Sequence, residues 1–269
     1  MPKVAETYVL GMKVSNTSYD HAMQTITAWA QKRASKYVCL ATVNNVMESH
    51  DSAKFQSVMN EADLVTPDGM PVVWALRLLG QRNATRVYGP DLTPMLLKQA
   101  EKIGLPVGFY GGASDVLCRL LNVIRQTFPD LRLAYAFSPP FRPLTPSEDE
   151  QVVDAINRSG TRILFIGLST PKQDYWMSTH RGKVKAVMVG VGAAFDFLAG
   201  SKAQAPRWMM GIGLEWLFRL LTEPRRLWKR YLKHNPRFVI YFALQLLRLK
   251  RYNLLAVRKG ELVNSRRDS

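Results

Sequence analysis

Short apolar runs alternate along the chain with longer segments in which apolar residues recur at helical spacing. Residues 37–43 (YVCLATV) and 63–66 predict short strands, whereas residues 17–32 and 70–80 show the three-to-four-residue periodicity of helices. Three further segments each predict a strand that ends in glycine or small polar residues and then continues as a helix or an apolar stretch: residues 107–112, 163–176 and 184–200. This pattern predicts a layered α/β fold with a largely parallel sheet.

Proline marks several expected boundaries. Residues 137–150 (FSPPFRPLTPSEDE) predict a loop, and their acidic end, residues 148–150, favours the N-terminus of the next helix. Near the C-terminus, residues 222–224 (TEP) predict a helix capped by the threonine. Residues 235–236 (NP) repeat this device and predict the start of another helix.

Charge is concentrated in the C-terminal quarter of the chain. The formal net charge is +16, and residues 201–269 contribute +12 of it, from 16 Lys/Arg and 4 Asp/Glu. The preceding 200 residues are nearly balanced at +4. We therefore expect a basic appendage over residues 201–269 and a polyanionic partner, such as nucleic acid, anionic lipid or a phosphorylated substrate.

Basic residues of this appendage recur at helical spacing among aromatic and aliphatic residues. Five of them lie 7, 4, 3 and 4 residues apart, near one face of a helix: Arg219, Arg226, Arg230, Lys233 and Arg237. Residues 238–247 (FVIYFALQLL) are too few to span a bilayer, but they suit a helix that lies in the membrane interface. We expect amphipathic helices in contact with an anionic membrane surface; the alternative is a helix packed on the body with a solvated basic face.

Composition excludes several classes of protein. Two cysteines, Cys39 and Cys118, cannot form a disulfide framework and indicate a reducing compartment. No N-terminal signal segment and no run of about 18 apolar residues is apparent. Gly190 and Gly192 form half of a dinucleotide fingerprint, but Phe195 occupies the third glycine position. Because Walker, zinc-binding and nucleophile-elbow patterns are also missing, we expect neither a cofactor nor a metal site.

Small polar residues follow the predicted strands, at the sheet edge where α/β proteins bind ligands. They are Thr42, Asn44, Asn45, Thr66, Asp68, Gly111, Gly112, Ser169, Thr170, Gln173, Gly190 and Gly192. This set contains neither cysteine nor histidine, and therefore suits a nucleotide or a sugar better than a metal ion.

Asp68 is the carboxylate in this set, and it lies between Pro67 and Gly69. Pro-Asp-Gly is a common turn, because proline presets φ, aspartate bonds its own backbone and glycine accepts positive φ. The same position after a strand also suits a catalytic base. From the local residues alone both interpretations stand.

Several motifs together resemble the WecG/TagA/CpsF family of glycosyltransferases. They are TVNN (42–45), TPDGMPVVW (66–74), RVYGPDL (86–92), GFYGG (108–112), GLSTPKQDYW (167–176), GVGAAFDFLAG (190–200), APRWMMGIGLEWLFRLLTEPRRLWKRY (205–231) and NPRF (235–238). The resemblance extends in order over about residues 7 to 245.

The resemblance implies a Rossmann-like α/β catalytic body over residues 1–200, which allows two halves divided near residues 100–106, and a basic helical appendage over residues 201–269. It implies an inverting, metal-independent enzyme that transfers a sugar from a UDP-sugar to a polyprenyl-diphosphate-linked saccharide in bacterial envelope or exopolysaccharide synthesis. Such an enzyme would lie in the cytoplasm, peripherally on the inner face of the plasma membrane. The donor sugar stays open between N-acetylmannosamine, its uronic acid and glucose, and oligomers are allowed.

The motifs also assign residues to roles. The resemblance makes Asp68 the base, with Thr42, Asn44 and Arg86 in the same catalytic pocket, and implies a place there for Gln173. Without a metal, cations and backbone N–H groups must stabilise the leaving UDP. The expected substrate-binding residues are Asn45, Gly111, Gly112, Ser169, Gln173, Gly192, Arg219, Arg225 and Arg226. Lys229 stands where a further arginine is expected, and lysine lacks the bidentate fork.

Two other classes of function remain as alternatives. A UDP-sugar enzyme with a soluble acceptor would not need to contact membranes. A nucleic-acid-binding protein would account for the charge but leaves the polar strand-end residues unexplained, and its binding would depend steeply on salt. We therefore expect no nucleic-acid partner.

Overall fold

Six parallel strands form the central sheet of the computed structural model, which describes residues 4–250 and 252. The strand order is β4-β3-β8-β7-β5-β6. The strands are β3 (Lys36–Ala41), β4 (Leu64–Pro67), β5 (Val107–Gly111), β6 (Leu133–Phe137), β7 (Ile163–Gly167) and β8 (Val187–Gly190). The predicted α/β, Rossmann-like fold is confirmed. Strands from both sides of residues 100–106 belong to this sheet, and a division into two halves there stays a prediction.

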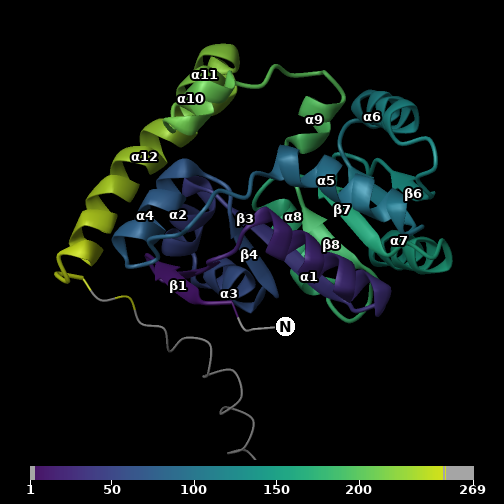
Figure 1. Cartoon of the computed structure of the whole chain (residues 1–269), viewed down its shortest axis with the longest axis horizontal. Helices are drawn as coiled ribbons and strands as arrows, with labels where there is room; N and C mark the ends of the chain where they lie inside the picture. The colour runs from purple at the N-terminus through teal and green to yellow at the C-terminus, as the bar shows by residue number, and fades with distance from the viewer. Residues whose placement is uncertain (1–3, 251, 253–269) are drawn as a thin grey trace, which may run out of the picture.

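Helices cover both faces of the sheet, as Figure 1 shows. One face carries α1 (Tyr19–Gln31), α5 (Gly89–Lys102), α6 (Ser114–Thr127) and α9 (Ala194–Leu198). The other carries α2 (Val43–Asp51), α3 (Ala53–Glu61), α4 (Met70–Leu78), α7 (Pro146–Arg158) and α8 (Lys172–Thr179). In β7, Phe165 packs into the first of these cores and Ile166 into the second. Burial on both faces explains why the strands read as continuous apolar runs.

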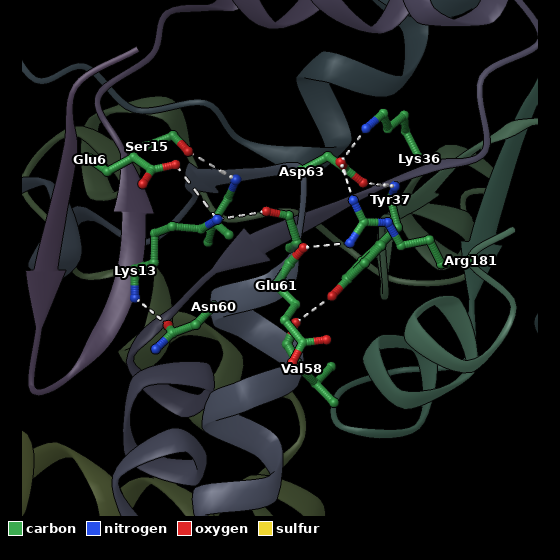
Figure 2. A network of polar contacts seen from close by, with 12 residues as sticks. Glu6, Lys13, Ser15, Lys36, Tyr37, Val58, Asn60, Glu61, Asp63 and Arg181 are labelled. Atoms are coloured by element: carbon green, nitrogen blue, oxygen red, sulfur yellow. Dashed lines mark hydrogen bonds and ion pairs between the residues drawn. The ribbon is translucent and has the colours of Figure 1, made fainter. Parts of the chain in front are cut away.

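A two-stranded antiparallel hairpin, β1 (Glu6–Val9) and β2 (Met12–Ser15), is fixed beside the amino end of β4. The Lys13 ammonium group donates to the Ala62 carbonyl oxygen over 2.8 Å. The Asp63 carboxylate accepts bonds from the Lys36 ammonium, the Tyr37 backbone N–H and the Arg181 guanidinium (Figure 2). This network lies at the amino ends of the strands. The carboxyl ends, where the polar residues of the predicted site follow the strands, are on the opposite side of the sheet and remain free for a ligand.

The appendage consists of α10 (Arg207–Gly211), α11 (Glu215–Thr222) and the long helix α12 (Pro224–Leu246). In Figure 1, α12 runs along the side of the body past α4 and α2. Residues 251 and 253–269 of the predicted appendage lie outside the described residues.

Local helix signals in the appendage were partly wrong. Pro236 lies inside α12 instead of starting a helix, because His234 and Phe238 on either side of it are both buried against the body. Tertiary packing therefore overrides the cost of a proline in the helix interior. Glu223, not Thr222, occupies the N-cap position, and the Thr222 hydroxyl donates back to the Phe218 carbonyl oxygen in α11.

Polar contacts fix the lower part of α12 to the body. The Arg237 guanidinium donates to both oxygens of Asp51 at the end of α2, over 2.8 and 2.5 Å. The Gln245 side chain accepts from the Leu10 backbone N–H and donates to the Tyr8 carbonyl oxygen, over 2.8 Å each. The position of the appendage is thus set by specific bonds to α2 and to the hairpin.

The predicted loop over residues 137–150 is shorter than expected. β6 extends to Phe137 and α7 begins at Pro146. The acidic residues do lie at the start of a helix, because Thr145 and Glu148 form a capping box there.

Candidate active site

A cavity of about 920 Å³ opens where the carboxyl ends of the sheet strands face the appendage. This volume is in the range of sites for nucleotide-sized ligands. Ten of the predicted site residues line it: Thr42, Asn44, Asn45, Asp68, Arg86, Ser169, Gln173, Gly192, Arg219 and Arg226. Gly111, Gly112 and Arg225 are not among its lining residues. Residues that follow the strands and residues of the appendage therefore line the same cavity.

Asp68 follows directly after β4, and its backbone N–H donates to the Ala41 carbonyl oxygen over 3.0 Å. Its Oδ1 atom accepts the Gly89 backbone N–H at the start of α5, also over 3.0 Å. A Cβ atom on Gly89 would lie 2.5 Å from the Leu40 Cδ1 atom, so a larger residue here would force the Leu40 side chain to shift. The carboxylate is therefore held by a helix N-terminus, where negative charge is favoured.

The environment of Asp68 tunes it toward proton transfer. Burial of the carboxyl group raises its pKa to about 6, against the opposing effect of the Arg86 charge. The nearby Glu215 carboxylate raises this pKa further. Asp68 is thus ionised at neutral pH, yet it is a stronger base than an exposed aspartate.

Arg86 lies against Asp68 and is held on three sides. Its Nε atom donates to the Asp68 carbonyl oxygen, and its Nη2 atom donates to Glu215 of α11. The guanidinium carbon lies 4.0 Å from the ring centroid of Tyr88. A fixed positive charge therefore lines the cavity beside the candidate base.

The TVNN segment after β3 divides into scaffold and ligand-facing groups. The Thr42 hydroxyl donates to Asn45 Oδ1 over 2.6 Å, within a capping box that begins α2. The Asn45 amide donates to the Thr170 hydroxyl over 3.2 Å, which ties β3 to the loop after β7. Asn44 Oδ1 is buried and has no hydrogen-bond partner among the described residues. Asn44 is thus the member of this segment whose side chain is free to bind a substrate.

The glycine and glutamine positions have different roles. Gln173 is buried, and its Oε1 atom accepts the Gly192 backbone N–H over 3.1 Å, which fixes the turn after β8. Gly111 has φ of 118°, and a Cβ atom there would lie 2.7 Å from the Gly167 carbonyl carbon. Gly112 also has a positive φ, of 73°. Gly111 therefore serves the close packing of β5 on β7, and a role of Gly111 and Gly112 in binding stays a prediction.

Three arginines of the appendage line the cavity: Arg219, Arg226 and Arg230. The Nε atoms of Arg219 and Arg230 are buried without a hydrogen-bond partner among the described residues. Burial lowers the pKa of Arg230. Two guanidinium groups with unsatisfied donors in the cavity that holds the candidate base form a site that favours an anionic ligand.

Arg230 and Glu215 are site residues that the predicted set did not include. Arg230 was one member of a helical stripe, and the sequence did not indicate which members would face the body. Glu215 pairs with Arg86 across 129 positions of sequence, a distance at which local patterns carry no signal.

An apolar groove continues from this cationic region between α4 and α12. We define it by Trp74, Leu78, Val239, Phe242 and Leu246, all of which line the cavity. Their exposure is uneven, because Phe242 is buried whereas Leu78 and Val239 are exposed. The cavity is therefore amphipathic, with charged groups near Asp68 and an apolar extension beyond them.

A nucleotide-sized cavity at the carboxyl edge of a parallel sheet, with one tuned carboxylate and several guanidinium groups, defines an enzyme acting on phosphorylated substrates. The chain belongs to the WecG/TagA/CpsF family of glycosyl transferases, whose family model matches residues 7–252. It is therefore a glycosyltransferase, and the resemblance predicted from the motifs is confirmed.

Two relatives extend over most of the chain. It is 29% identical over 214 residues, 79% of this chain and 80% of the relative, to a protein of Bacillus spizizenii. It is 28% identical over 246 residues, 89% of this chain and 92% of the relative, to a protein of Staphylococcus aureus. Both relatives carry the name N-acetylglucosaminyldiphosphoundecaprenol N-acetyl-beta-D-mannosaminyltransferase.

Among the described residues, no helix is both long and apolar enough to cross a bilayer. Within the same residues, no three His, Cys, Asp or Glu side chains gather where they could hold a metal ion.

Proposed function

We propose that this glycosyltransferase moves N-acetylmannosamine from a UDP-sugar to an N-acetylglucosamine unit on a polyprenyl diphosphate, with inversion and without a metal. The observation that carries the proposal is the meeting of Asp68 and the appendage arginines in one cavity. The names of the two relatives support the choice of sugar and acceptor.

Asp68 acts as the base in this mechanism. An acceptor hydroxyl attacks the anomeric carbon of the donor while its proton passes to the Asp68 carboxylate. A bond from the acceptor oxygen to that carbon forms, the bond from the carbon to the UDP oxygen breaks, and the electron pair leaves with UDP. A single displacement inverts the anomeric centre, so one carboxylate is sufficient. Arg86 and nearby cations stabilise the charge on the departing diphosphate.

The appendage arginines bind the diphosphate of the acceptor. Arg219 and Arg230 have buried, unpartnered Nε atoms, and a diphosphate oxygen is the acceptor that such donors fit. Arg226 lines the same wall and is partly neutralised by Glu223. In this proposal the lipid-linked phosphates lie beside the groove between α4 and α12.

The apolar groove holds the first isoprenyl units of the acceptor. It begins at the arginines and contains no charged residue among its five defining members. A diphosphate followed by a hydrocarbon chain has the same sequence of charged and apolar parts as this cavity. The fit favours a lipid-linked acceptor over a soluble one.

The outer surface of the appendage faces the membrane in this proposal. Trp208 of α10 is exposed, as are Ile240 and Leu247 of the α12 region, and the same helix carries the exposed cations Lys229 and, just past its end, Arg248. Exposed aromatic and aliphatic side chains next to cations suit an anionic interface. The protein would then lie peripherally on the inner face of the bacterial plasma membrane, where UDP-sugars are available.

The deciding experiment is a matrix of UDP-sugars against N-acetylglucosaminyl diphosphates with prenyl chains of increasing length, without bilayer or detergent, read by mass spectrometry. We expect one added N-acetylhexosamine from UDP-N-acetylmannosamine, with KM for the acceptor falling over the first isoprenyl units. Equal transfer to soluble N-acetylglucosamine would support the soluble-acceptor alternative. Salt-dependent binding of duplex or single-stranded nucleic acid without any transfer would support the other.

A further inference from the structure

Glu215 joins the appendage to the catalytic pocket. It is the first residue of α11, and its side chain is only 15% exposed. Its Oε2 atom accepts from the Arg86 guanidinium, and its Oε1 atom accepts from the Tyr88 hydroxyl over 3.2 Å. Both partners belong to the body and lie in the loop between α4 and α5.

These contacts decide how Arg86 is oriented. The Asp68 carbonyl oxygen and the Tyr88 ring hold the guanidinium from the body, and Glu215 holds its Nη2 atom from the appendage. Arginine has a flexible stem, so a planar carboxylate partner fixes the direction in which its remaining N–H groups point. Without Glu215, Arg86 would keep its charge but lose this constraint.

We propose that Glu215 is the positioning residue through which the appendage completes the catalytic centre: it aims Arg86 at the leaving diphosphate and places a negative charge beside Asp68. The inference rests on the proposed function, and it adds that the appendage contributes to catalysis as well as to lipid binding.

The influence of Glu215 on Asp68 can be tested through the charged and titratable groups that surround the Asp68 carboxylate. Arg86 faces it from the loop before α5, Glu215 and Arg219 from α11, and Tyr19 and Tyr88 lie within electrostatic reach. Of these, the Glu215 charge raises the pKa of Asp68 whereas the two arginines lower it. Replacing Glu215 by a neutral isostere should therefore lower the pKa of Asp68 from about 6.

The test compares Glu215→Gln with Glu150→Gln in the full-length protein. Glu150 is an exposed acid on α7 and does not line the cavity, so its variant controls for the loss of one negative charge. For Glu215→Gln we expect kcat to fall about tenfold to a hundredfold, with the acid limb of the pH profile moved to lower pH. Glu150→Gln should match the wild type in both respects.

A measurement without turnover separates this inference from the proposed function. The Asp68 carboxyl group can be titrated by difference infrared spectroscopy against Asp68→Asn, in the presence and absence of the Glu215→Gln change. We expect a lower titration midpoint in the Glu215 variant, whatever the substrates prove to be. Tyr88→Phe, which removes one bond to Glu215 and no charge, should leave the midpoint in place.

Two results would overturn the inference. One is a Glu215→Gln variant with wild-type kcat and an unmoved acid limb. The other is a variant that loses activity while the Asp68 midpoint stays at its wild-type value, which would make Glu215 a structural contact alone. Failure of all donor and acceptor pairs with the wild type would instead count against the proposed function.

Discussion

Asp68 and Gly89 meet in the wall of the cavity, where the Asp68 carboxylate accepts the Gly89 backbone N–H that opens α5. The bond holds the candidate base, which follows β4, against the N-terminus of α5. One oxygen is used in this contact, and among the described residues the other oxygen accepts no hydrogen bond. The carboxylate is thus fixed in position and still able to take a proton.

Replacing Asp68 by Asn should separate folding from catalysis. The amide oxygen can still accept the Gly89 N–H, but an amide cannot act as the base. We expect the transfer rate to fall about 10²- to 10⁴-fold with UDP affinity unchanged, measured by product formation and calorimetry. Asp115→Asn, on the exposed side of α6, is the matched control. Near-normal turnover by Asp68→Asn would end the assignment of the base.

The same variant should be more stable than the wild type at pH 7 to 8. The folded-state pKa of Asp68, about 6, lies above its ordinary value of 3.8. The folded state therefore binds the proton more tightly, stability falls as pH rises between these values, and above pH 6 the full cost is present. Because the carboxylate faces the cavity, we expect removal of this cost to raise the free energy of unfolding by about 1 to 2 kcal/mol. Denaturant titrations at pH 4 and pH 8 test this, because the gain should vanish at pH 4.

The pH dependence of transfer should report the same group. The base must be ionised, so kcat/KM of the wild type should decline below about pH 6 with a slope of one. An ordinary aspartate would hold activity to about pH 4. Rates measured from pH 4.5 to 8 at constant ionic strength distinguish the two, and a flat profile down to pH 5 would contradict the environment described for Asp68.

Arg230 and Arg225 allow a matched comparison of two cations on α12. Arg230 lines the cavity with a buried Nε atom, whereas Arg225 is exposed and does not line it. We expect Arg230→Ala to raise KM for a lipid diphosphate about 10- to 100-fold, because it removes charge-assisted bonds. Arg225→Ala should raise KM less, and an equal or larger effect there would support the prediction that Arg225 binds the substrate.

Membrane contact should depend on exposed apolar residues that lie outside the cavity lining. Ile240→Glu and Leu247→Glu should each weaken binding to anionic vesicles about tenfold or more, since each removes an inserted side chain. Transfer to a short-chain acceptor without vesicles should not change. Val123→Glu on α6 provides the control for an exposed apolar residue elsewhere. Undiminished co-sedimentation of the α12 variants would place the membrane contact on another surface.

Residues that follow strands could be predicted, because strand ends and ligand sites have a fixed relation in parallel sheets. Asp68, Asn44 and Gln173 were found in this way. Contacts that depend on how α12 docks could not be predicted. Glu215 gains its partner Arg86 from a body more than a hundred residues away in sequence, and Pro236 was misread because the packing beside it has no local signature.

α5 and β6 are two of the elements that the sequence patterns did not predict. α5 begins with Gly89 and Pro90, which resemble a loop, and β6 is the edge strand of the sheet with side chains less buried than those of its neighbours. Thr42 and Asn45 were correctly placed beside the cavity, but their side chains bond each other in a helix cap. Position near a site is thus easier to predict than the bonds a side chain makes there.

The bonds from Gln245 to Leu10 and Tyr8 join residues 235 and 237 positions apart. During synthesis the ribosome releases the sheet-forming region before α12 has been made, so the sheet is able to assemble while its pocket still lacks one wall. Catalytic competence then arrives only after the appendage has been made, and a chain that stops before it would hold its nucleotide-facing residues without the wall that brings Glu215 and the arginines to them.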